Sequence, residues 1–216
     1  FDGRDSTFDA HTKVVVMKSM LDRLSVLGVA IVAMVSHSLV TPAAAAGVVQ
    51  LKKGDNVVFI GGALAEREQY FGHIEAQIHA LHPELNLAVR DQGFTADEVR
   101  FRPRSLDFGP PDKHLTLVRA DVIFAFFGFA ESFNGETGLV TFEQELRDFI
   151  AHTATQNYSG DGAPQVVLCS PIAHENLNNS NLPDGSVSNP NLKLYTRTMA
   201  KVASETETPF IDLFSL

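Results

Sequence analysis

Hydroxyl, carboxylate and imidazole side chains follow two apolar runs of this chain. Glu131 and Ser132 come after residues 121–127, and His174 comes after residues 166–169. A serine hydroxyl beside a histidine base is the arrangement that attacks an ester carbonyl. The ends of parallel strands bring distant residues together, so one hypothesis pairs Ser132 with His174. The other is that Glu131 and Ser132 cap the next segment and that His174 bonds to loop backbone.

Other reactive side chains offer weaker signals. Thr95 is a second candidate nucleophile, although hydroxyls in such turns often bond to backbone. His79 and His82 are spaced one helical turn apart, which permits a shared metal ion, but no third ligand is apparent. We interpret both as surface histidines and predict no metal and no cofactor. Cys169 is the single cysteine, so no disulfide forms within the chain, and we expect it to be a buried core residue.

The glycine pair after the first apolar run predicts a ligand-binding turn. Residues 57–60 are apolar, Gly61 and Gly62 follow at once, and a helix-forming run begins near Ala63. This order is typical of a strand that ends in a tight turn and feeds a helix. In an open α/β sheet such a turn lies at the carboxyl edge, where ligands bind.

The elements that must position these residues alternate along the chain. Continuous apolar runs predict strands that are covered on both faces, and residues repeating at helical spacing predict helices between them. The expected fold is a three-layer α/β/α sandwich with a parallel sheet. We predict strands at 57–60, 85–89, 121–127, 165–169 and 210–213, helices at 70–81, 142–156 and 192–204, irregular chain at 101–114 and a surface loop at 176–190.

Four stretches, in the right order, resemble the sequence blocks of the SGNH (GDSL-type) esterase and acylhydrolase superfamily. Residues 57–63 stand where the family has Gly-Asp-Ser after a strand, and residues 90–97 stand where it has Asn-x-Gly-x-Ser-Gly. Residues 121–132 stand at the Gly-x-Asn-Asp block, and residues 166–171 look like the fourth strand and its Ser-Pro. The resemblance covers residues 53–216 and is closest to a divergent exported bacterial branch. It implies a flavodoxin-like SGNH fold with strand order 2-1-3-4-5.

The resemblance also implies a site that has lost key groups. In the family, a serine attacks the ester, a histidine held by an aspartate takes the proton, and an oxyanion hole stabilises the intermediate. Here Ala63 takes the nucleophile position and Ala130 takes the position of the oxyanion asparagine. The backbone N–H groups of Ala63 and Gly93 are the oxyanion donors that would remain. The family's Asp-x-x-His block is expected after Leu216 and is not in this sequence.

Two functions are consistent with these residues. The family label implies hydrolysis of acyl or carbohydrate esters, whereas the two alanines favour a non-catalytic module that keeps the crevice and binds its ligand. The expected partner is a small-molecule ester or a carbohydrate. The expected ligand-binding residues are Gly62, Thr95, Phe129 and Glu131. A flavin- or nucleotide-binding protein is a weaker alternative, because strand one lacks a Gly-x-Gly-x-x-Gly loop.

The charge of the chain bears on its partners. A net charge of −9 argues against nucleic acids and anionic membranes as partners. Arg100, Arg102 and Arg104 are a local exception. Their alternate spacing favours a solvated loop, with anion binding as the alternative.

The first 46 residues predict export rather than fold. Residues 1–16 read as a spurious or disordered leader, and residues 17–46 as a signal peptide that ends in an alanine-rich cleavage site. Its apolar run, residues 24–35, is shorter than the ~20 residues of a membrane span, although a lone N-terminal anchor is the alternative. Residues 47–216 then form one exported domain, periplasmic or extracellular, without a stable membrane span. Because the chain ends soon after strand five, we expect a truncated domain with apolar surface exposed on one side of the sheet.

Overall fold

The computed structural model describes residues 47–216, and the predicted leader and signal peptide lie outside the described residues. The described part contains one sheet of parallel strands in the order β2-β1-β3-β4-β5. The predicted parallel sheet and the strand order implied by the family resemblance are therefore confirmed. The strands are β1 (Asn56–Gly61), β2 (Ala88–Asp91), β3 (Val122–Phe126), β4 (Gln165–Cys169) and β5 (Phe210–Ile211).

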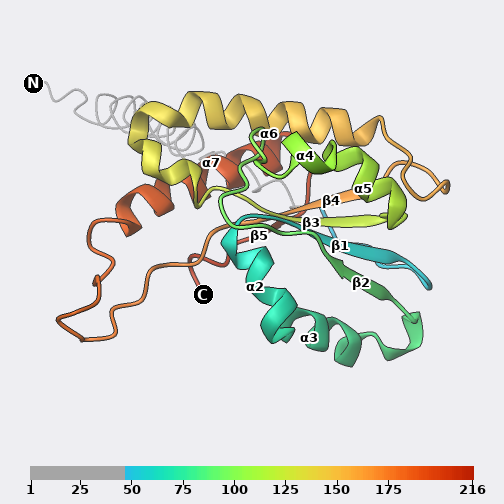
Figure 1. The fold of residues 1–216 in the computed structure, drawn as a ribbon, viewed down its shortest axis with the longest axis horizontal. Helices are drawn as coiled ribbons and strands as arrows, with labels where there is room; N and C mark the ends of the chain where they lie inside the picture. The colour runs from blue at the N-terminus through green and yellow to red at the C-terminus, as the bar shows by residue number, and fades with distance from the viewer. Residues whose placement is uncertain (1–46) are drawn as a thin grey trace, which may run out of the picture. The chain divides into compact units, whose positions relative to one another are not determined.

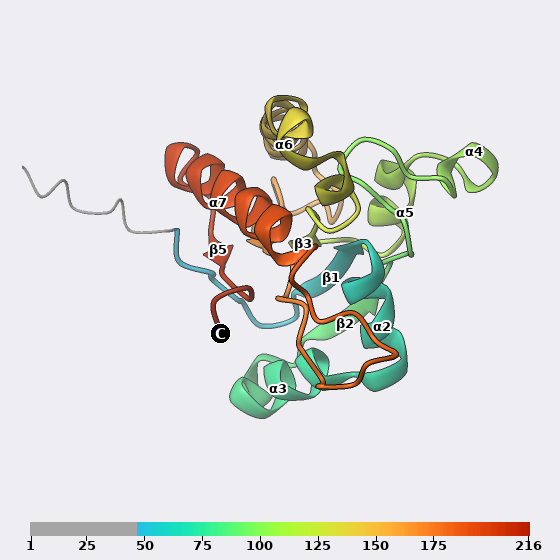
Figure 2. The ribbon, with the colours of Figure 1, turned by 90° about the vertical axis from the view of Figure 1, so that its left-hand side faces the viewer.

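Helices cover both faces of the sheet, as Figures 1 and 2 show. Side chains of α2 and α3 pack on one face, and side chains of α5, α6 and α7 pack on the other. This confirms the three-layer α/β/α sandwich. The helices are α2 (Ala63–Phe71), α3 (His73–Leu81), α4 (Ser105–Phe108), α5 (Pro111–Leu117), α6 (Leu139–Ala154) and α7 (Asn189–Glu205), with short 3-10 helices η1 (Pro83–Leu85) and η2 (Glu131–Gly138).

The central strand β3 shows why the sequence specifies this fold. All five of its residues are buried. Ile123 and Ala125 contribute to the core under α6 and α7, whereas Val122, Phe124 and Phe126 contribute to the core on the opposite face. A strand that buries both faces must be apolar throughout, and residues 122–126 are.

Two boundaries in the first half of the sheet differ from the prediction. The single helix expected over 70–81 is two helices, α2 and α3, which meet at Gly72 in the left-handed region (φ +62°). Strand two was expected at 85–89 but begins at Ala88, because Pro83 starts the 3-10 helix η1. Glycine ends helices readily in this conformation, and proline suits a first helical turn.

The segment 101–114 was predicted to be irregular, and this was wrong. It contains α4 and most of α5. Pro111 occupies the first turn of α5, where its missing N–H costs nothing. The prolines that suggested an irregular loop therefore mark the start of a helix.

The far end of the sheet is better covered than the sequence suggests. We expected an exposed apolar face there, but Val167 and Cys169 of β4 are both buried. Val49, Leu51 and Leu213 pack against this part of the core. Residues that precede β1 and follow β5 thus add to the cover of this core.

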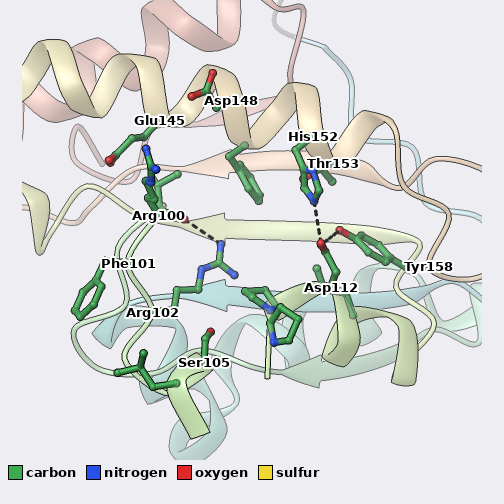
Figure 3. Close-up of a pocket in the computed structure, with 16 residues that line it drawn as sticks. Arg100, Phe101, Arg102, Ser105, Asp112, Glu145, Asp148, His152, Thr153 and Tyr158 are labelled. Atoms are coloured by element: carbon green, nitrogen blue, oxygen red, sulfur yellow. Dashed lines mark hydrogen bonds and ion pairs between the residues drawn. The ribbon is translucent and has the colours of Figure 1, made fainter. Parts of the chain in front are cut away.

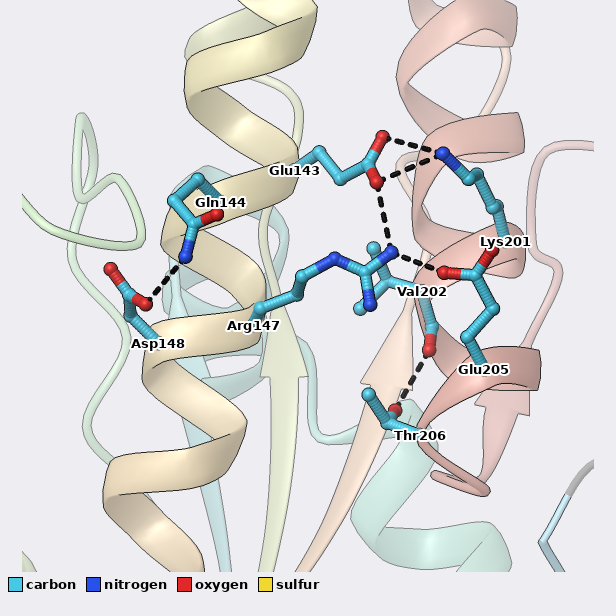
Figure 4. Close-up of polar contacts among 8 residues, drawn as sticks. All are labelled: Glu143, Gln144, Arg147, Asp148, Lys201, Val202, Glu205 and Thr206. Atoms are coloured by element: carbon cyan, nitrogen blue, oxygen red, sulfur yellow. Dashed lines mark hydrogen bonds and ion pairs between the residues drawn. The ribbon is translucent and has the colours of Figure 1, made fainter.

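Charged side chains connect α6 and α7 on the surface, as Figure 4 shows. Glu143 of α6 accepts hydrogen bonds from Arg147 on its own helix and from Lys201 of α7, and Arg147 also pairs with Glu205. Such exposed pairs contribute little to stability, typically about 0–1 kcal/mol. The two helices are held mainly by the core beneath them. Within residues 47–216, no helix combines the length and apolar character needed to cross a membrane.

Candidate functional site

A small apolar cavity lies at the carboxyl ends of the central strands. Its volume is about 200 Å³. Ala63 and Ala130, which the sequence resemblance predicts at the nucleophile and oxyanion-asparagine positions, both line it. We call this cavity the alanine pocket; its walls are Gly62, Ala63, Leu64, Arg67, Asp97, Phe126, Phe127, Phe129, Ala130, Ser170, Pro171 and Ile172.

The two glycines of the first turn set the position of Ala63. A Cβ on Gly61 (φ +120°) would lie 2.1 Å from the carbonyl oxygen of Phe126, so only glycine fits between β1 and β3 here. The N–H of Gly62 donates to the same carbonyl at 3.0 Å. Ala63 then begins α2, and its N–H has no acceptor within the helix. Ala63 therefore presents a backbone donor and a methyl group at the position predicted for the nucleophile.

The N–H of Gly93, a predicted oxyanion donor, has an acceptor within the protein. It donates to Asp91 Oδ1 at 2.7 Å, so it is occupied in this structure and is not an available oxyanion donor. Gly93 is absent from the walls of the alanine pocket and instead lies against Ala65 and Glu66 of α2. A Cβ at this position would lie 2.5 Å from the Cβ of Ala65, so the glycine allows the loop after β2 to approach α2.

The structure does not bring Ser132 and His174 together. The Ser132 hydroxyl is buried and donates to the carbonyl of Phe129 at 2.7 Å. His174 is exposed, and its Nδ1 lies 3.1 Å from Ser188 Oγ. Each side chain has its own local partner, and no hydrogen bond joins the two residues. The structure thus contradicts this nucleophile–base pair.

Glu131 was expected to contact ligand, but it is buried against backbone. Its Oε1 accepts from Val99 N at 3.0 Å, and its Oε2 accepts from Gly128 N at 2.9 Å. Burial raises the pKa of this carboxyl to about 7, against the lowering effect of the backbone hydrogen bonds. Glu131 therefore joins two loops and does not line the alanine pocket.

The remaining predicted ligand residues divide into two groups. Gly62 and Phe129 line the alanine pocket. Thr95 does not; it is exposed and its hydroxyl donates to Glu66. Ser170 lines the pocket, but its hydroxyl donates to the Pro171 carbonyl at 3.0 Å and accepts two backbone N–H groups. No side-chain hydroxyl of the pocket is therefore placed to attack a ligand.

A second cavity lies beside the first, and sequence reasoning missed it. Its volume is about 230 Å³, and we call it the arginine cavity. Asp97 lies in the walls of both cavities. The walls of the arginine cavity are Ile60, Asp91, Gln92, Asp97, Arg102, Arg104, Ser105, Phe108, Gly109, Pro111, His114 and Leu115.

Two of the three alternate arginines belong to this cavity, so they do not simply decorate a solvated loop. The guanidinium of Arg102 stacks 5.1 Å from the Phe127 ring centroid and 5.9 Å from that of Phe149. Arg104 donates to the Gln92 carbonyl at 2.7 Å. Only Arg100 is exposed to solvent as expected. The alternation of the arginines was a usable signal, but their burial depends on aromatic residues distant in sequence.

Two acids among the lining residues carry perturbed pKa values, although the carboxyl group of Asp91 lies on the side of α2, where Glu68 and Glu66 raise its pKa further. Desolvation by burial raises the pKa of Asp91 to about 6 and that of Asp97 to about 6. Arg102 and Arg104 oppose the shift at Asp97, and the N–H of Gly93 opposes it at Asp91. Each carboxyl group has one buried oxygen, Asp91 Oδ2 and Asp97 Oδ1, with no hydrogen-bond partner among residues 47–216.

A larger, open groove of about 700 Å³ runs between α6 and the segment 99–112 (Figure 3). Arg102 lies in the walls of both this groove and the arginine cavity. At the other end, His152 Nε2 lies 2.9 Å from Asp112 Oδ2, and the Tyr158 hydroxyl donates to Asp112 Oδ1. Burial and the neighbouring carboxylate raise the pKa of Tyr158. The carboxylate stands between imidazole and hydroxyl, so the histidine is not placed to activate the tyrosine.

Metal binding and thiol chemistry find no support in the described chain. Among residues 47–216, no three His, Cys, Asp or Glu side chains gather as a metal site would require. His79 Nε2 lies 3.7 Å from Glu75 Oε1 on the same helix. Cys169 is buried in β4, as predicted, and burial raises the pKa of its thiol, which suppresses the reactive thiolate.

Comparison with known proteins defines the class of fold. No protein-family model and no curated protein sequence matches the chain. Among solved structures, it is similar to a catalytic mutant of Axe2, an acetylxylan esterase from Geobacillus stearothermophilus, with a TM-score of 0.56 and 16% identity over 77% of this chain and 80% of that one.

Two further solved structures agree. The aryl esterase of M. smegmatis gives a TM-score of 0.53 and 13% identity, over 76% of this chain and 86% of that one. Est24, a carbohydrate acetylesterase from Sinorhizobium meliloti, gives 0.52 and 11%, over 73% and 83%. The chain therefore has the three-layer fold of SGNH-type esterases. At these identities the likeness concerns the fold, and function must be argued from the site.

Proposed function

We propose that this chain is an SGNH-type ester-hydrolase domain that binds a small acyl ester in the alanine pocket without hydrolysing it there. The supporting observation is that Ala63 and Ala130 line one apolar cavity at the carboxyl edge of the sheet. Binding sites in open α/β sheets occupy this edge. The pocket lies at the edge where such sites occur, whereas the predicted nucleophile and oxyanion-asparagine positions, Ala63 and Ala130, carry only methyl groups.

The dimensions and lining of the pocket favour an acyl group. A volume of about 200 Å³ is below the ~300–1,000 Å³ of sites for drug-sized ligands, so a short acyl chain fits better than a long one. Phe126, Phe127 and Phe129 supply apolar walls. The N-terminal end of α2 adds a partial positive charge, which suits the carbonyl oxygen of an ester. Esters are also what the structurally similar enzymes named above act on.

Loss of hydrolysis follows from covalent chemistry. An acyl-enzyme needs an oxygen, sulfur or nitrogen nucleophile, and Ala63 carries only a methyl group. Losing an oxyanion donor, as at Ala130, costs about 100- to 1,000-fold in rate on its own. If the predicted signal peptide, residues 17–46, directs export, binding takes place outside the cytoplasm.

The test is to measure binding and turnover separately with p-nitrophenyl butyrate. We expect saturable binding by ligand-observed NMR, no release of p-nitrophenol above background, and no labelling by a fluorophosphonate probe. Ala130→Leu fills the pocket and should weaken binding at least about tenfold, since an overfilled apolar site excludes its ligand. Ala151→Leu, at an exposed position of α6, is the matched control and should bind normally.

Either half of the proposal can fail. Turnover together with fluorophosphonate labelling would show a working nucleophile elsewhere and restore the hydrolase interpretation. Absence of saturable binding to the folded wild-type chain would contradict the proposal that it binds a short acyl ester. Equal loss of binding in Ala130→Leu and Ala151→Leu would show that the ester does not bind in the alanine pocket.

A further inference from the structure

An arginine in the open groove between α6 and residues 99–112, here called the α6 groove, has no close acidic partner. Arg102 lies in its walls, and Figure 3 shows the side chain reaching into the middle of the groove. Its guanidinium makes one hydrogen bond within residues 47–216, to the Val99 carbonyl at 3.5 Å, which is at the outer limit for such a bond. No carboxylate oxygen of the described chain lies within 4.0 Å of it. Most of its five N–H donors are therefore left to water or a ligand.

Two aromatic rings restrict this guanidinium. Its Cζ lies 5.1 Å from the Phe127 ring centroid and 5.9 Å from that of Phe149. Burial lowers the pKa of Arg102, although the negative charges of Asp97 and Asp112 raise it, so the cation has lost much of its hydration. A carboxylate can bind a guanidinium through two parallel hydrogen bonds. Because Arg102 is already desolvated and held in place, it gives up little when it binds such a group.

Most other charged side chains of the groove have partners among themselves. Asp112 accepts a hydrogen bond from the Tyr158 hydroxyl, and its Oδ2 lies 2.9 Å from His152 Nε2. Burial raises the pKa of Glu145, and the positive charge of Arg100 opposes that shift, so these two charges offset one another.

Two further acids oppose an anion at Arg102 without excluding it. Asp148 is exposed, accepts a hydrogen bond from Gln144 at 2.8 Å and lies at the α6 edge of the groove (Figure 3), where solvent screens its charge. Asp97 lines the arginine cavity and not the α6 groove. Burial raises the pKa of Asp97 to about 6, so about half of this carboxyl is neutral at pH 6. At that pH, Asp97 offsets only part of the charge of Arg102.

The walls around Arg102 are largely apolar. They include Val99, Phe101, Leu106, Pro110, Leu115 and Phe149. Phe101 is 57% exposed and Leu106 is 81% exposed, so both leave apolar area in water. A ligand body that lay on them would remove this area from water, which a bare inorganic ion cannot do. The groove volume of about 700 Å³ lies within the ~300–1,000 Å³ of small-molecule sites.

We infer that the α6 groove is a binding site for a monocarboxylate with an aromatic or alkyl body, whose carboxylate binds the guanidinium of Arg102. The supporting observation is a restrained arginine without an acidic partner at the centre of an apolar groove. Of the three alternate arginines, Arg104 already donates to the Gln92 carbonyl and Arg100 is exposed, which leaves Arg102 for the anion. The α6 groove shares no lining residue with the alanine pocket, so this site does not depend on the proposed ester binding.

The experiment is a titration of the full chain with hydrocinnamate at pH 6, followed by protein NMR. A carboxylic acid of ordinary pKa is ionised at this pH. Hydrocinnamamide has nearly the same shape without the charge, and acetate has the charge without the aromatic body. We expect saturable shifts with hydrocinnamate at amides of residues 99–106 and 145–153. The amide and acetate should each bind at least about tenfold more weakly, because each lacks one of the two interactions.

Two matched pairs of variants locate the binding site. Arg102→Lys keeps the positive charge but loses the planar pair of donors, and should weaken hydrocinnamate binding about tenfold. Arg197→Lys, at an exposed position of α7, should bind as wild type does. Phe101→Ala removes part of the apolar wall and should weaken binding about fivefold. Phe71→Ala removes a similarly exposed ring, 63% against 57%, from α2 and should have no effect.

Binding that falls in Arg102→Lys and Phe101→Ala, with unchanged unfolding temperatures and normal controls, supports the site. If Arg102→Lys fails to fold, Phe101→Ala and the comparison of hydrocinnamate with its amide decide the question. Equal binding of the amide would show an apolar groove without an anion site and would overturn the inference. Equal binding of acetate or inorganic phosphate would show that the apolar walls do not contribute, and would also overturn it. So would the absence of saturable shifts with hydrocinnamate.

Binding in the α6 groove must also be distinguished from binding in the alanine pocket. If Ala130→Leu loses hydrocinnamate and Arg102→Lys keeps it, the acid occupies the alanine pocket and the inference is wrong. If wild type binds hydrocinnamate through Arg102 but does not bind p-nitrophenyl butyrate, the proposed function fails while the carboxylate site stands. The reverse result contradicts the carboxylate site alone.

Discussion

The role of a single residue in this protein depends more on its hydrogen-bond partners than on its residue type. Ser132 and Glu131 have the chemistry of catalytic groups and follow a strand at the carboxyl edge. Ser132 nevertheless donates to a neighbouring carbonyl, and Glu131 accepts two backbone N–H groups. Both side chains hold the chain in place after β3, so they support the site rather than act in it.

A substitution of Glu131 tests this structural role at the level of a single residue. Glu131→Gln replaces one of two acceptor oxygens by an NH₂ group that faces a backbone N–H. We expect a loss of about 1–3 kcal/mol in the free energy of unfolding, the cost of a buried group without its partner. Urea denaturation at pH 7 measures it. Glu136→Gln, an exposed position in the same 3-10 helix, should change stability little, and an equal loss in both variants would contradict this role.

At the scale of elements, the junction of β1 with α2 fixes the alanine pocket. β1 must end in a residue without a side chain, because the carbonyl of Phe126 occupies the space of a Cβ at Gly61. The next residues then turn directly into α2 and carry Ala63 to the pocket wall. The same closeness recurs at Gly93, where the loop after β2 touches the first turn of α2.

A matched pair of glycines tests this junction. Gly61 and Gly162 have nearly the same φ, +120° and +121°, but a Cβ on Gly162 meets nothing within 4 Å. Both alanine variants suffer the backbone strain, and only Gly61→Ala adds a backbone clash. We expect Gly61→Ala to lose about 3 kcal/mol more than Gly162→Ala, at the upper end of overpacking effects. Thermal unfolding of both variants measures the difference, and similar losses would contradict the close approach.

At the scale of the whole molecule, buried acids make stability depend on pH. The folded-state pKa is raised to about 6 at Asp91 and Asp97 and to about 7 at Glu131. A raised value means that the native state binds more protons than the unfolded state between about pH 4 and 7. The free energy of unfolding contributed by these groups therefore falls as pH rises through this window.

Urea midpoints at pH 5, 6 and 7.5 should show this trend, with the highest midpoint at pH 5. For Glu131 alone the effect is on the order of 3 kcal/mol, because one pKa unit corresponds to about 1.4 kcal/mol. Glu131→Gln should reduce the slope of urea midpoint against pH. This reduction distinguishes the effect of Glu131 from the general stabilisation that a smaller net negative charge gives at low pH. Exposed acids with lowered pKa values, Glu143 and Asp184, act in the opposite sense at lower pH but are screened by solvent. A midpoint that rises from pH 5 to 7.5 would contradict the trend.

The sequence by itself determined the sheet, its covering layers and the alanines in the pocket. Apolar runs such as residues 122–126 specify strands buried on both faces, and that signal is local. The glycine pair and Ala63 are likewise read directly from residues 61–63. The wrongly predicted boundaries also have local causes. A glycine such as Gly72 can lie within a helix or end it, and a proline such as Pro111 can lie in a loop or begin a helix.

Only the tertiary structure decided which polar groups meet. Asp97, Arg102 and Arg104 occupy one cavity because Phe127 and Phe149, from distant elements, provide the surface on which Arg102 stacks. The same dependence gave Ser132 and His174 separate partners. Hydrogen bonds and pKa shifts depend on distances of a few ångströms and on burial, and both are set by packing between segments that the sequence keeps far apart.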